Sequence, residues 1–243
     1  MQNESLLIKG FLPMSTIDYK GKVASTIFLQ GCNFRCPFCH NPELVPLSFE
    51  GNLLKADDVI SYLKENRDFV DAVCISGGEP TIHSGLPAFI MRLKKDGFFV
   101  KLQTNGTNPG MLKILIDGKL LDYISMDVKA PIEKYELLAG AKPDLEKIKK
   151  SVNLIMSSGV EYSFHTTVSP ELNILDIKQI GTWLNGAKTY YLQQFRPEKT
   201  LNPEYEKKIP HTPEEIKRMA DLVRANFGKI IIEGADIESF GNE

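Results

Sequence analysis

The sequence has almost no net charge and lacks any long hydrophobic run. Its 243 residues include 29 Lys and Arg against 31 Asp and Glu, so the formal charge is 29 − 31 = −2. No stretch approaches the roughly 20 apolar residues of a transmembrane helix, and a near-neutral chain attracts nucleic acid or anionic lipid weakly. Met1–Ser5 is polar and acidic, unlike the start of a signal peptide. We expect a cytoplasmic protein without a membrane or nucleic-acid partner.

Glycine and proline are not abundant enough for a collagen-like or low-complexity chain. There are 18 Gly and 14 Pro, with 42% hydrophobic and 25% charged residues, which is close to the globular average. This composition also excludes a disordered chain and a coiled coil. The length suits one large α/β domain. Because no shift in composition marks a linker, we expect a single domain.

Cysteines are few, and three of the four are clustered. Cys32, Cys36 and Cys39 fall within eight residues, while Cys74 stands alone in an apolar run. A disulfide framework spreads its cysteines through the chain and belongs to oxidising compartments. The cluster therefore indicates metal or redox chemistry. For Cys74 we expect a small buried side chain in the core.

Short apolar or β-branched runs alternate with amphipathic stretches along the chain. The alternation, repeated about six times, predicts an α/β fold of parallel strands with helices outside, curled into a full or partial barrel. The expected strands are 23–30, 72–76, 99–104, 123–128, 162–168 and 190–195, with a weaker seventh at 229–233. The expected helices are 56–66, 86–96, 109–116, 145–158, 174–185 and 212–226. The last of these begins with Thr212 as N-cap, Pro213 and Glu215.

Polar motifs stand where four of the expected strands end. They are Gly77-Gly78-Glu79-Pro80, Thr104-Asn105-Gly106, Asp127-Val128-Lys129 and Gln193-Gln194. The carboxyl ends of the strands carry the functional groups in barrels of this kind. We expect the site at these strand ends.

The cysteines lie on a short loop that directly follows the first expected strand. Three thiolates spaced in this way can each bind one iron of a [4Fe–4S] cluster, which leaves the fourth iron open for a ligand. Zinc held by the three cysteines and His40 is an alternative, but the adjacent side chains of Cys39 and His40 project in divergent directions. Structural zinc sites also usually pair two separate segments. Three free thiols without a metal are the remaining alternative.

The Cys-x3-Cys-x2-Cys spacing, with Phe38 before the last cysteine, resembles the signature of radical S-adenosylmethionine (SAM) enzymes. The Gly77–Pro80 turn stands where that family places its motif for the SAM amino group. Glycine in this turn lets backbone carbonyls approach a ligand, and Glu79 can anchor the turn or supply negative charge. The resemblance implies that SAM binds the open iron and is cleaved to a 5′-deoxyadenosyl radical that abstracts hydrogen.

Within that family the chain resembles the glycyl-radical activating enzymes, and among them the single-cluster activators of anaerobic ribonucleoside-triphosphate reductase. The matching segments are 10–19, 30–44, 104–106, 125–131 and 192–197, so the resemblance extends over roughly residues 8 to 234. It implies a partial (β/α)6 barrel of the radical SAM fold. We expect one domain, 1–243, with an N-terminal extension 1–21, a barrel core 22–233 and a tail 234–243.

The resemblance also implies which residues hold the cofactors. Asp127 and Lys129 would hold the carboxylate and ribose region of SAM, although an exposed ion pair at a strand end is the plainer alternative. No acid–base catalytic residue is implied, because the cofactors supply the radical. The implied metal ligands are Cys32, Cys36 and Cys39, and the implied cofactor-binding residues are Phe38, Gly77, Gly78, Glu79, Pro80, Thr104, Asn105, Asp127, Lys129, His165 and Gln194.

Three positions depart from the family pattern. Lys20 replaces the proline of an Asp-Tyr-Pro-Gly segment, and Gln103 replaces an aspartate that joins a cation site in the pyruvate formate-lyase activator. His165 stands where an arginine would keep its charge and bind a carboxylate bidentately. These changes affect the expectation for cation binding and for the substrate.

The expected reaction is hydrogen abstraction from a glycine Cα of a partner enzyme, with anaerobic ribonucleotide reductase as the first candidate. A flavodoxin- or ferredoxin-type protein would donate the electron. The alternatives are activation of a pyruvate formate-lyase-like enzyme, a radical SAM reaction on a small molecule or RNA, and a non-catalytic metal-binding module.

Overall fold

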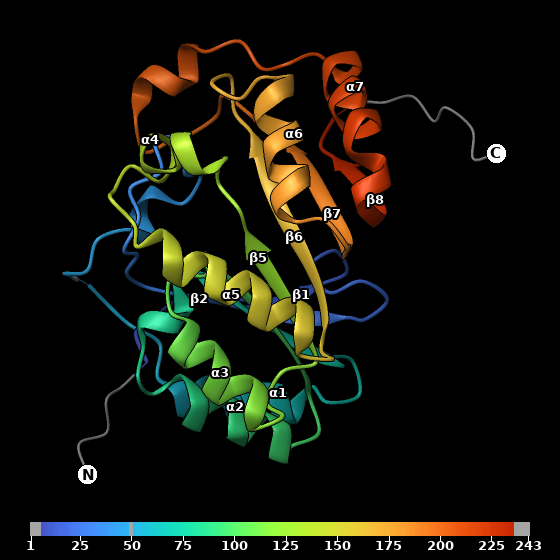
Figure 1. The fold of residues 1–243 in the computed structure, drawn as a ribbon. Helices are drawn as coiled ribbons and strands as arrows, with labels where there is room; N and C mark the ends of the chain where they lie inside the picture. Colours follow the sequence, from blue (N-terminus) through green and yellow to red (C-terminus); the bar gives the residue numbers. More distant parts are fainter. Residues whose placement is uncertain (1–5, 49–50, 236–243) are drawn as a thin grey trace. The chain divides into compact units, whose positions relative to one another are not determined.

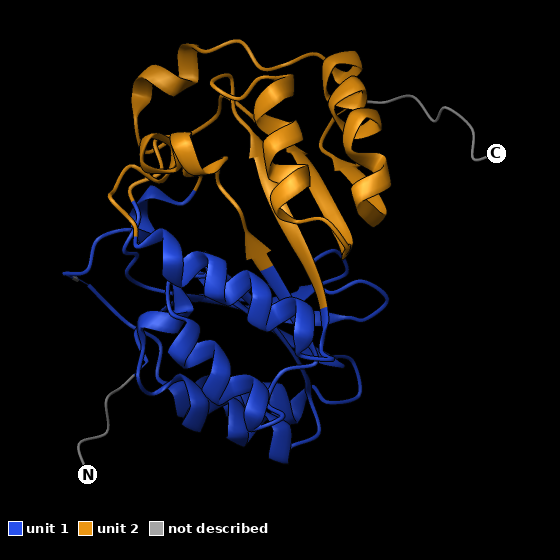
Figure 2. Cartoon of the chain, in the orientation of Figure 1, with its two compact units in different colours: residues 1–34, 41–125, 144–161 blue, residues 35–40, 126–143, 162–243 orange. Residues whose placement is uncertain are grey.

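The computed structural model (Figure 1) describes residues 6–48 and 51–235. The chain forms two compact units (Figure 2). Residues 1–5 of the expected N-terminal extension and residues 236–243 of the expected tail lie outside the described residues. Unit 1 comprises Met1–Phe34, Asn41–Ser125 and Asp144–Glu161, and unit 2 comprises Arg35–His40, Met126–Pro143 and Tyr162–Glu243.

Unit 1 is built on four strands that neighbour one another in chain order. They are β1 (Ile8–Ser15), β2 (Ala24–Leu29), β3 (Ala72–Gly77) and β4 (Phe99–Thr104). β1 runs antiparallel to β2, whereas β2, β3 and β4 are parallel, with Ala24 paired to Ala72 and Ala72 paired to Phe99. The helices of unit 1 are α1 (Ala56–Glu65), α2 (Leu86–Lys95), α3 (Pro109–Asp117) and α5 (Leu145–Ser157), with the 3-10 helices η1 (Pro42–Leu44) and η2 (Pro80–Ile82).

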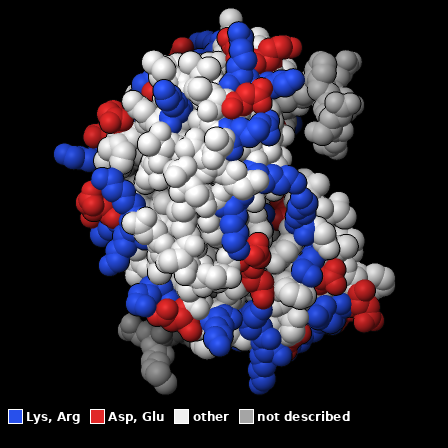
Figure 3. Space-filling view, turned by 45° about the vertical axis from the view of Figure 1, so that its right-hand side comes forward, with Lys and Arg blue, Asp and Glu red and all other residues white. Residues whose placement is uncertain are grey.

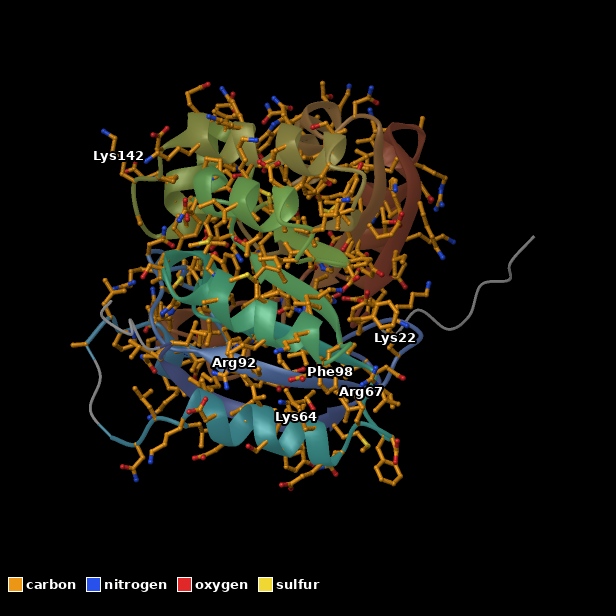
Figure 4. All side chains as sticks on the ribbon, turned by 90° about the horizontal axis from the view of Figure 1, so that it is seen from below. Lys22, Lys64, Arg67, Arg92, Phe98 and Lys142 are labelled. Atoms are coloured by element: carbon orange, nitrogen blue, oxygen red, sulfur yellow. The ribbon has the colours of Figure 1, made fainter. Side chains whose placement is uncertain are left out.

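The helices of unit 1 bury one apolar face each. Val59, Ile60 and Leu63 of α1 recur at helical spacing, and all three are buried. Before β3 and β4 begin, the Arg67 guanidinium lies 4.7 Å from the centroid of the Phe98 ring and donates to the Gly97 carbonyl oxygen at 3.0 Å (Figure 4). This contact joins the two segments that lead into β3 and β4.

Unit 2 contains the parallel strands β6 (Glu161–Val168), β7 (Ala187–Gln194) and β8 (Phe227–Glu233), also in chain order. Only the first residue of β6, Glu161, is assigned to unit 1. Gly181 lets α6 and α7 pack closely, since a Cβ atom there would lie 2.7 Å from Cγ1 of Val223. The helices of unit 2 are α4 (Tyr135–Ala139), α6 (Ile174–Trp183) and α7 (Pro213–Val223), with η3 (Ile132–Lys134), η4 (Pro203–Lys207) and η5 (Arg224–Asn226).

Strand β5 (Tyr123–Asp127) begins in unit 1 and ends in unit 2. Before it, the Asp122 N–H donates to the Val100 carbonyl oxygen at 2.9 Å, which ties its start to β4. After it, the Val128 N–H donates to the His165 carbonyl oxygen at 2.8 Å, which ties its end to β6. The end of β5 therefore delivers Asp127 and Lys129 to the carboxyl ends of the unit 2 strands.

The expected α/β class and the parallel strands are confirmed. All six helices and all seven strands form, and β4 has the expected bounds. The last helix ends at Val223 instead of 226, because its final turn tightens into the 3-10 helix η5. The expectation missed β1 and the five-residue helix α4. The sequence of β1 contains Pro13, which argues against a strand. Its register with β2 is also interrupted twice, so the strand lacks the regular alternation by which the others were predicted.

Charges of both signs are interspersed on the face shown in Figure 3, in keeping with the formal charge of −2. Ion pairs also join surface charges, such as Arg92 with Asp57 at 2.6 Å between α2 and α1. None of the helices within the described residues combines the length and apolar character needed to cross a membrane.

Candidate functional site

The first half of the cysteine loop belongs to unit 1 and is fixed by its backbone. The Gly31 N–H donates to Leu44 O at 2.8 Å, and the Cys32 N–H donates to Val45 O at 3.1 Å. The Phe34 N–H points back at the Cys32 sulfur, with 3.3 Å between the nitrogen and Sγ. This contact holds the Cys32 sulfur against the backbone of its own loop.

The Gly77-Gly78 turn at the end of β3 approaches the backbone of β2 and of the cysteine loop. A Cβ atom at Gly78 would lie 2.0 Å from Gly31 O, and one at Gly77 would lie 2.3 Å from Leu29 N. Gly77 also has a φ of +124°, which disfavours other residues. The close packing of the two strand ends therefore requires glycine at both positions, whether or not a ligand also approaches this turn.

Glu79 is fully buried directly after this turn, and it joins the ends of β3 and β4. Its Oε1 accepts hydrogen bonds from the Thr81 N–H at 3.0 Å, from the Thr81 hydroxyl and from the Thr104 hydroxyl at 2.7 Å, and its Oε2 accepts from the Asn105 N–H at 2.6 Å. Burial raises the pKa of Glu79, and the four hydrogen bonds oppose that shift. Of the two roles expected for Glu79, the structure shows the anchor.

The same network extends from Asn105 to the cysteine loop. Asn105 Nδ2 donates to Asn33 Oδ1 at 2.8 Å, and Asn33 Nδ2 donates to the Thr107 hydroxyl at 2.7 Å. Asn33 immediately follows Cys32. A continuous path of hydrogen bonds therefore links the glycine turn, the end of β4 and the residue next to the first cysteine.

The second half of the cysteine loop belongs to unit 2. The Arg35 N–H donates to Ala139 O at 2.8 Å, and a Cβ atom at Gly140 would lie 1.9 Å from Arg35 O. Gly140 has a φ of +61° and ends α4, so it serves both the helix end and this close approach. The Cys39 N–H donates to Cys36 O at 3.0 Å, which closes a turn with both cysteines at its ends.

Asp127 and Lys129 form an ion pair with unequal exposure. Lys129 Nζ lies 2.7 Å from Asp127 Oδ2, and their side chains are 15% and 49% exposed, respectively. Nζ also lies 5.9 Å from the centroid of the buried Phe38 ring. Burial lowers the pKa of Lys129, but Asp127 and the nearby Cys36 outweigh burial, so the pKa is raised overall. A fixed positive charge therefore stands beside Cys36 and Phe38.

His165 and Gln194 occupy the two neighbouring strands of unit 2. The His165 ring stacks on Tyr191, with centroids 4.3 Å apart and 7° between the planes, and its Nε2 lies 2.8 Å from the Ser163 hydroxyl. Gln194 Nε2 donates to His211 O at 2.9 Å, while Gln194 Oε1 is buried without a partner among the described residues. Within unit 2, Phe38, Asp127 and Lys129 thus come together, whereas His165 and Gln194 make separate contacts.

The donor set fits an iron–sulfur cluster. Cys32, Cys36, Cys39 and Cys74 form no disulfide bond. Within residues 6–48 and 51–235, no three His, Cys, Asp or Glu side chains are placed to hold one metal ion, but a cluster does not require this because each thiolate binds its own iron. Cys74 is fully buried in β3, as expected, and burial raises its pKa to about 12, so it stays an unreactive thiol.

Some residues of this region were not predicted from the sequence. Asn33 reaches Asn105 across 72 positions of the chain, and no local pattern foretells such a contact. Gly140 follows an apolar stretch, as the glycine at a helix end often does, and that signal could have located α4. Tyr205, which contacts Phe38, lies in a segment without any motif.

Comparison with known proteins gives the class of this site. Residues 26–184 match the model of the Radical SAM superfamily. A protein of Methanocaldococcus jannaschii named as a glycyl-radical enzyme activating enzyme is 34% identical over 236 residues, which cover 93% of this chain and 95% of that protein. A protein of Methanococcus maripaludis named as a GTP 3′,8-cyclase is 26% identical over 222 residues, which cover 85% of this chain and 72% of that protein.

A solved structure agrees on the fold. The crystal structure of Streptococcus suis SuiB bound to S-adenosylmethionine superimposes with a TM-score of 0.67 at 17% identity, covering 85% of this chain. This chain spans about half the length of that protein, 49%. The likeness confirms the radical SAM fold, a partial barrel of parallel strands.

The chain is thus a radical SAM enzyme. It belongs to the Radical SAM superfamily, and its full-length similarity places it with the glycyl-radical activating enzymes of that superfamily. A [4Fe–4S] cluster and SAM are the cofactors of this family, and the three clustered cysteines and the Asp127–Lys129 pair are compatible with both.

Proposed function

We propose that this enzyme activates a glycyl-radical enzyme, with anaerobic ribonucleoside-triphosphate reductase as the first candidate partner. The observation that carries the proposal is the similarity to an activating enzyme over 93% of this chain and 95% of the relative. Because the match covers both proteins almost entirely, it includes the parts that would meet a substrate.

In this proposal Cys32, Cys36 and Cys39 bind the cluster. When bound, the cofactors would supply the one-electron reductive cleavage of SAM, so that methionine is released and a hydrogen atom of the partner's glycine ends in 5′-deoxyadenosine. The electron comes from a protein donor of the flavodoxin or ferredoxin type. No side chain needs to act as an acid or a base.

The residues of this chain bind and orient the cofactors. Ten residues are proposed to contact SAM or the cluster: Phe38, Gly77, Gly78, Pro80, Thr104, Asn105, Asp127, Lys129, His165 and Gln194. Glu79 keeps the turn and the end of β4 in register, as its four hydrogen bonds indicate. Lys129 supplies a fixed positive charge, which suits the carboxylate of SAM and the negative charge of the thiolates.

The test is electron paramagnetic resonance on the reduced, cluster-loaded enzyme mixed with SAM and each candidate partner. A protein radical is expected that disappears when the partner's glycine is replaced by alanine. Deuterium at that glycine Cα should appear in 5′-deoxyadenosine. SAM cleavage without a radical on any candidate partner would contradict the proposal.

A second candidate function is a radical SAM reaction on a small molecule. The similarity to a protein named as a GTP 3′,8-cyclase over 85% of this chain favours it. Incubation with GTP, SAM and a reductant separates the two proposals. Transfer of deuterium from labelled GTP to 5′-deoxyadenosine supports the reaction on a small molecule. No such transfer, together with a protein radical on a partner, supports the activation of a glycyl-radical enzyme.

A further inference from the structure

Residues 198–208, between β7 and α7, contact the second half of the cysteine loop through their backbone. Figure 1 draws this 198–208 segment in orange, and all of it belongs to unit 2. The Leu201 N–H donates to Cys39 O at 3.0 Å, and the Asn202 N–H donates to Pro37 O at 2.9 Å. At the start of the segment, Glu198 O accepts from His40 Nδ1 at 3.0 Å. Three consecutive contacts thus run along residues 37–40.

Tyr205 of the segment covers Phe38 with an aromatic ring. The two ring centroids are 6.5 Å apart, and Tyr205 also meets Phe195 edge-on at 6.2 Å. Phe38 is 4% exposed, Tyr205 is 6% exposed and Phe195 is fully buried. The three rings therefore keep water away from the turn between Cys36 and Cys39 on this side.

The 198–208 segment has its own anchors, so the cysteine loop does not have to hold it. The Thr200 N–H donates to Glu206 Oε1 at 3.1 Å, and the Thr200 hydroxyl donates to Asn202 O at 2.8 Å. At its far end, Lys208 forms a half-buried ion pair with Glu171, in the connection between β6 and α6. A segment fixed in this way can impose a conformation on a loop that it touches.

We propose that the 198–208 segment is the positioning element of the cluster loop, because its two backbone N–H groups and the Tyr205 ring fix the turn that presents Cys36 and Cys39. The inference rests on the proposed role of these cysteines as cluster ligands. Without the segment, Pro37 O and Cys39 O lose their partners and the turn gains conformations in which the two sulfurs point apart. The segment is thus required for cluster retention, although it lies outside residues 26–184, which match the superfamily model.

The first test uses the protein before cluster loading and compares Leu201→Pro with Leu201→Ala. Both variants lose the leucine side chain, but only proline removes the N–H that binds Cys39 O. The readout is the rate at which N-ethylmaleimide modifies each cysteine, located by mass spectrometry under reducing conditions. Cys39 and Cys36 should react about three- to tenfold faster in Leu201→Pro, the range that corresponds to one net hydrogen bond.

Two other cysteines serve as internal references. Cys32 is held in unit 1 by the Val45 carbonyl, and its rate should not change. Cys74 is fully buried, so its modification reports global unfolding. If Cys74 becomes reactive in Leu201→Pro, Tyr205→Ala is compared with Tyr205→Phe instead, because phenylalanine keeps the ring over Phe38.

The second test measures the loaded protein. Iron release to a chelator should be about tenfold faster in Tyr205→Ala than in Tyr205→Phe, the lower end of the range for residues that support metal ligands. The paramagnetic resonance spectrum of the reduced cluster should broaden in Tyr205→Ala and remain unchanged in Tyr205→Phe, which a general loss of stability would not produce. Equal cysteine rates and equal iron release in each matched pair would overturn the inference. If the wild-type protein binds no cluster at all, the proposed function fails instead.

Discussion

The Glu79 carboxylate accepts a hydrogen bond from the backbone N–H of Asn105 at 2.6 Å, across 26 positions of the chain. Through this bond a fully buried acidic side chain in the turn after β3 fixes the backbone at the end of β4. Asn105 in turn holds Asn33, beside the first cysteine of the loop. The conformation of the loop in unit 1 therefore depends on a residue 47 positions away from Cys32.

Replacement of Glu79 should be costly and should depend on the type of replacement. Glu79→Ala leaves four buried donors without an acceptor, and we expect it to lower the free energy of unfolding by about 3–5 kcal/mol. Glu79→Gln keeps the shape but turns an amide N–H₂ toward donors, which should cost about 1–3 kcal/mol. Urea unfolding of both variants measures the two values. Equal stability of Glu79→Ala and the wild type would show that the network carries no energy.

Two glycine replacements should have opposite effects. Gly78→Ala places a Cβ atom 2.0 Å from Gly31 O, where only backbone could move, so the free energy of unfolding should fall by several kcal/mol, on the order of 3. Gly110→Ala, in the first turn of α3, finds its nearest neighbour at 3.5 Å and should be neutral or stabilise by up to about 1 kcal/mol. Thermal unfolding of the two variants tests the pair. A stable, cluster-binding Gly78→Ala protein would contradict the close packing of the two strand ends.

The elements that the sequence predicts best depend on neighbouring residues alone. Thr212 and Glu215 form the expected reciprocal cap at the start of α7, because both partners lie within one turn. The missed elements depend on distant partners. β1 owes its structure to pairing with β2, and Pro13 within it bonds through its carbonyl to the Ser25 hydroxyl at 2.5 Å.

The candidate site divides in the same way. The cysteine spacing and the glycine turn are short motifs, so the sequence alone points to a cluster and to SAM. The contacts of Asn33 with Asn105 and of Leu201 with Cys39 join segments far apart in the chain. Only the folded backbone brings them together, so no pattern in the sequence could have predicted them.

Alanine at each cysteine in turn should separate the ligands from the core thiol. Cys32→Ala, Cys36→Ala and Cys39→Ala should each lose most of the cluster iron after anaerobic reconstitution, because fewer than three anchors remain. Cys74→Ala should keep its iron and cost on the order of 1 kcal/mol, the loss of a small buried side chain. Iron analysis of the four proteins decides the assignment. Full iron content in Cys36→Ala would rule out the proposed ligand set.

The unequal exposure of Asp127 and Lys129 predicts an asymmetry between their variants. Asp127→Ala leaves the largely buried Lys129 ammonium without its partner, whereas Lys129→Met leaves a half-exposed carboxylate that water can solvate. We expect Asp127→Ala to be less stable than Lys129→Met, by about 1–3 kcal/mol. Urea unfolding before cluster loading measures this difference.

Both of these variants should also bind SAM more weakly, by about one to two decades in affinity for a charge-assisted hydrogen bond. Equilibrium dialysis with the loaded proteins measures the affinity, and iron content serves as the control for an intact cluster. Unchanged affinity in both variants would contradict the proposed contact with SAM, whatever the outcome for stability.

Glu171 should make the protein sensitive to acid. Burial raises its pKa, but hydrogen bonds, with that of Lys208 first among them, lower it more, so the pKa lies below the ordinary value of about 4.3. A carboxyl with a lowered pKa in the folded state contributes stability that is fully present above its ordinary pKa. That contribution is lost as the pH falls through the folded-state pKa, because the carboxyl must then be protonated.

Unfolding free energies measured between about pH 7 and pH 3 should therefore decline less steeply in Glu171→Gln than in the wild type. Glu65→Gln is a suitable control, since Glu65 is exposed at the end of α1 in unit 1, away from the 198–208 segment in the chain. If Glu171→Gln and the wild type lose stability in parallel, the ion pair with Lys208 does not anchor this segment in solution.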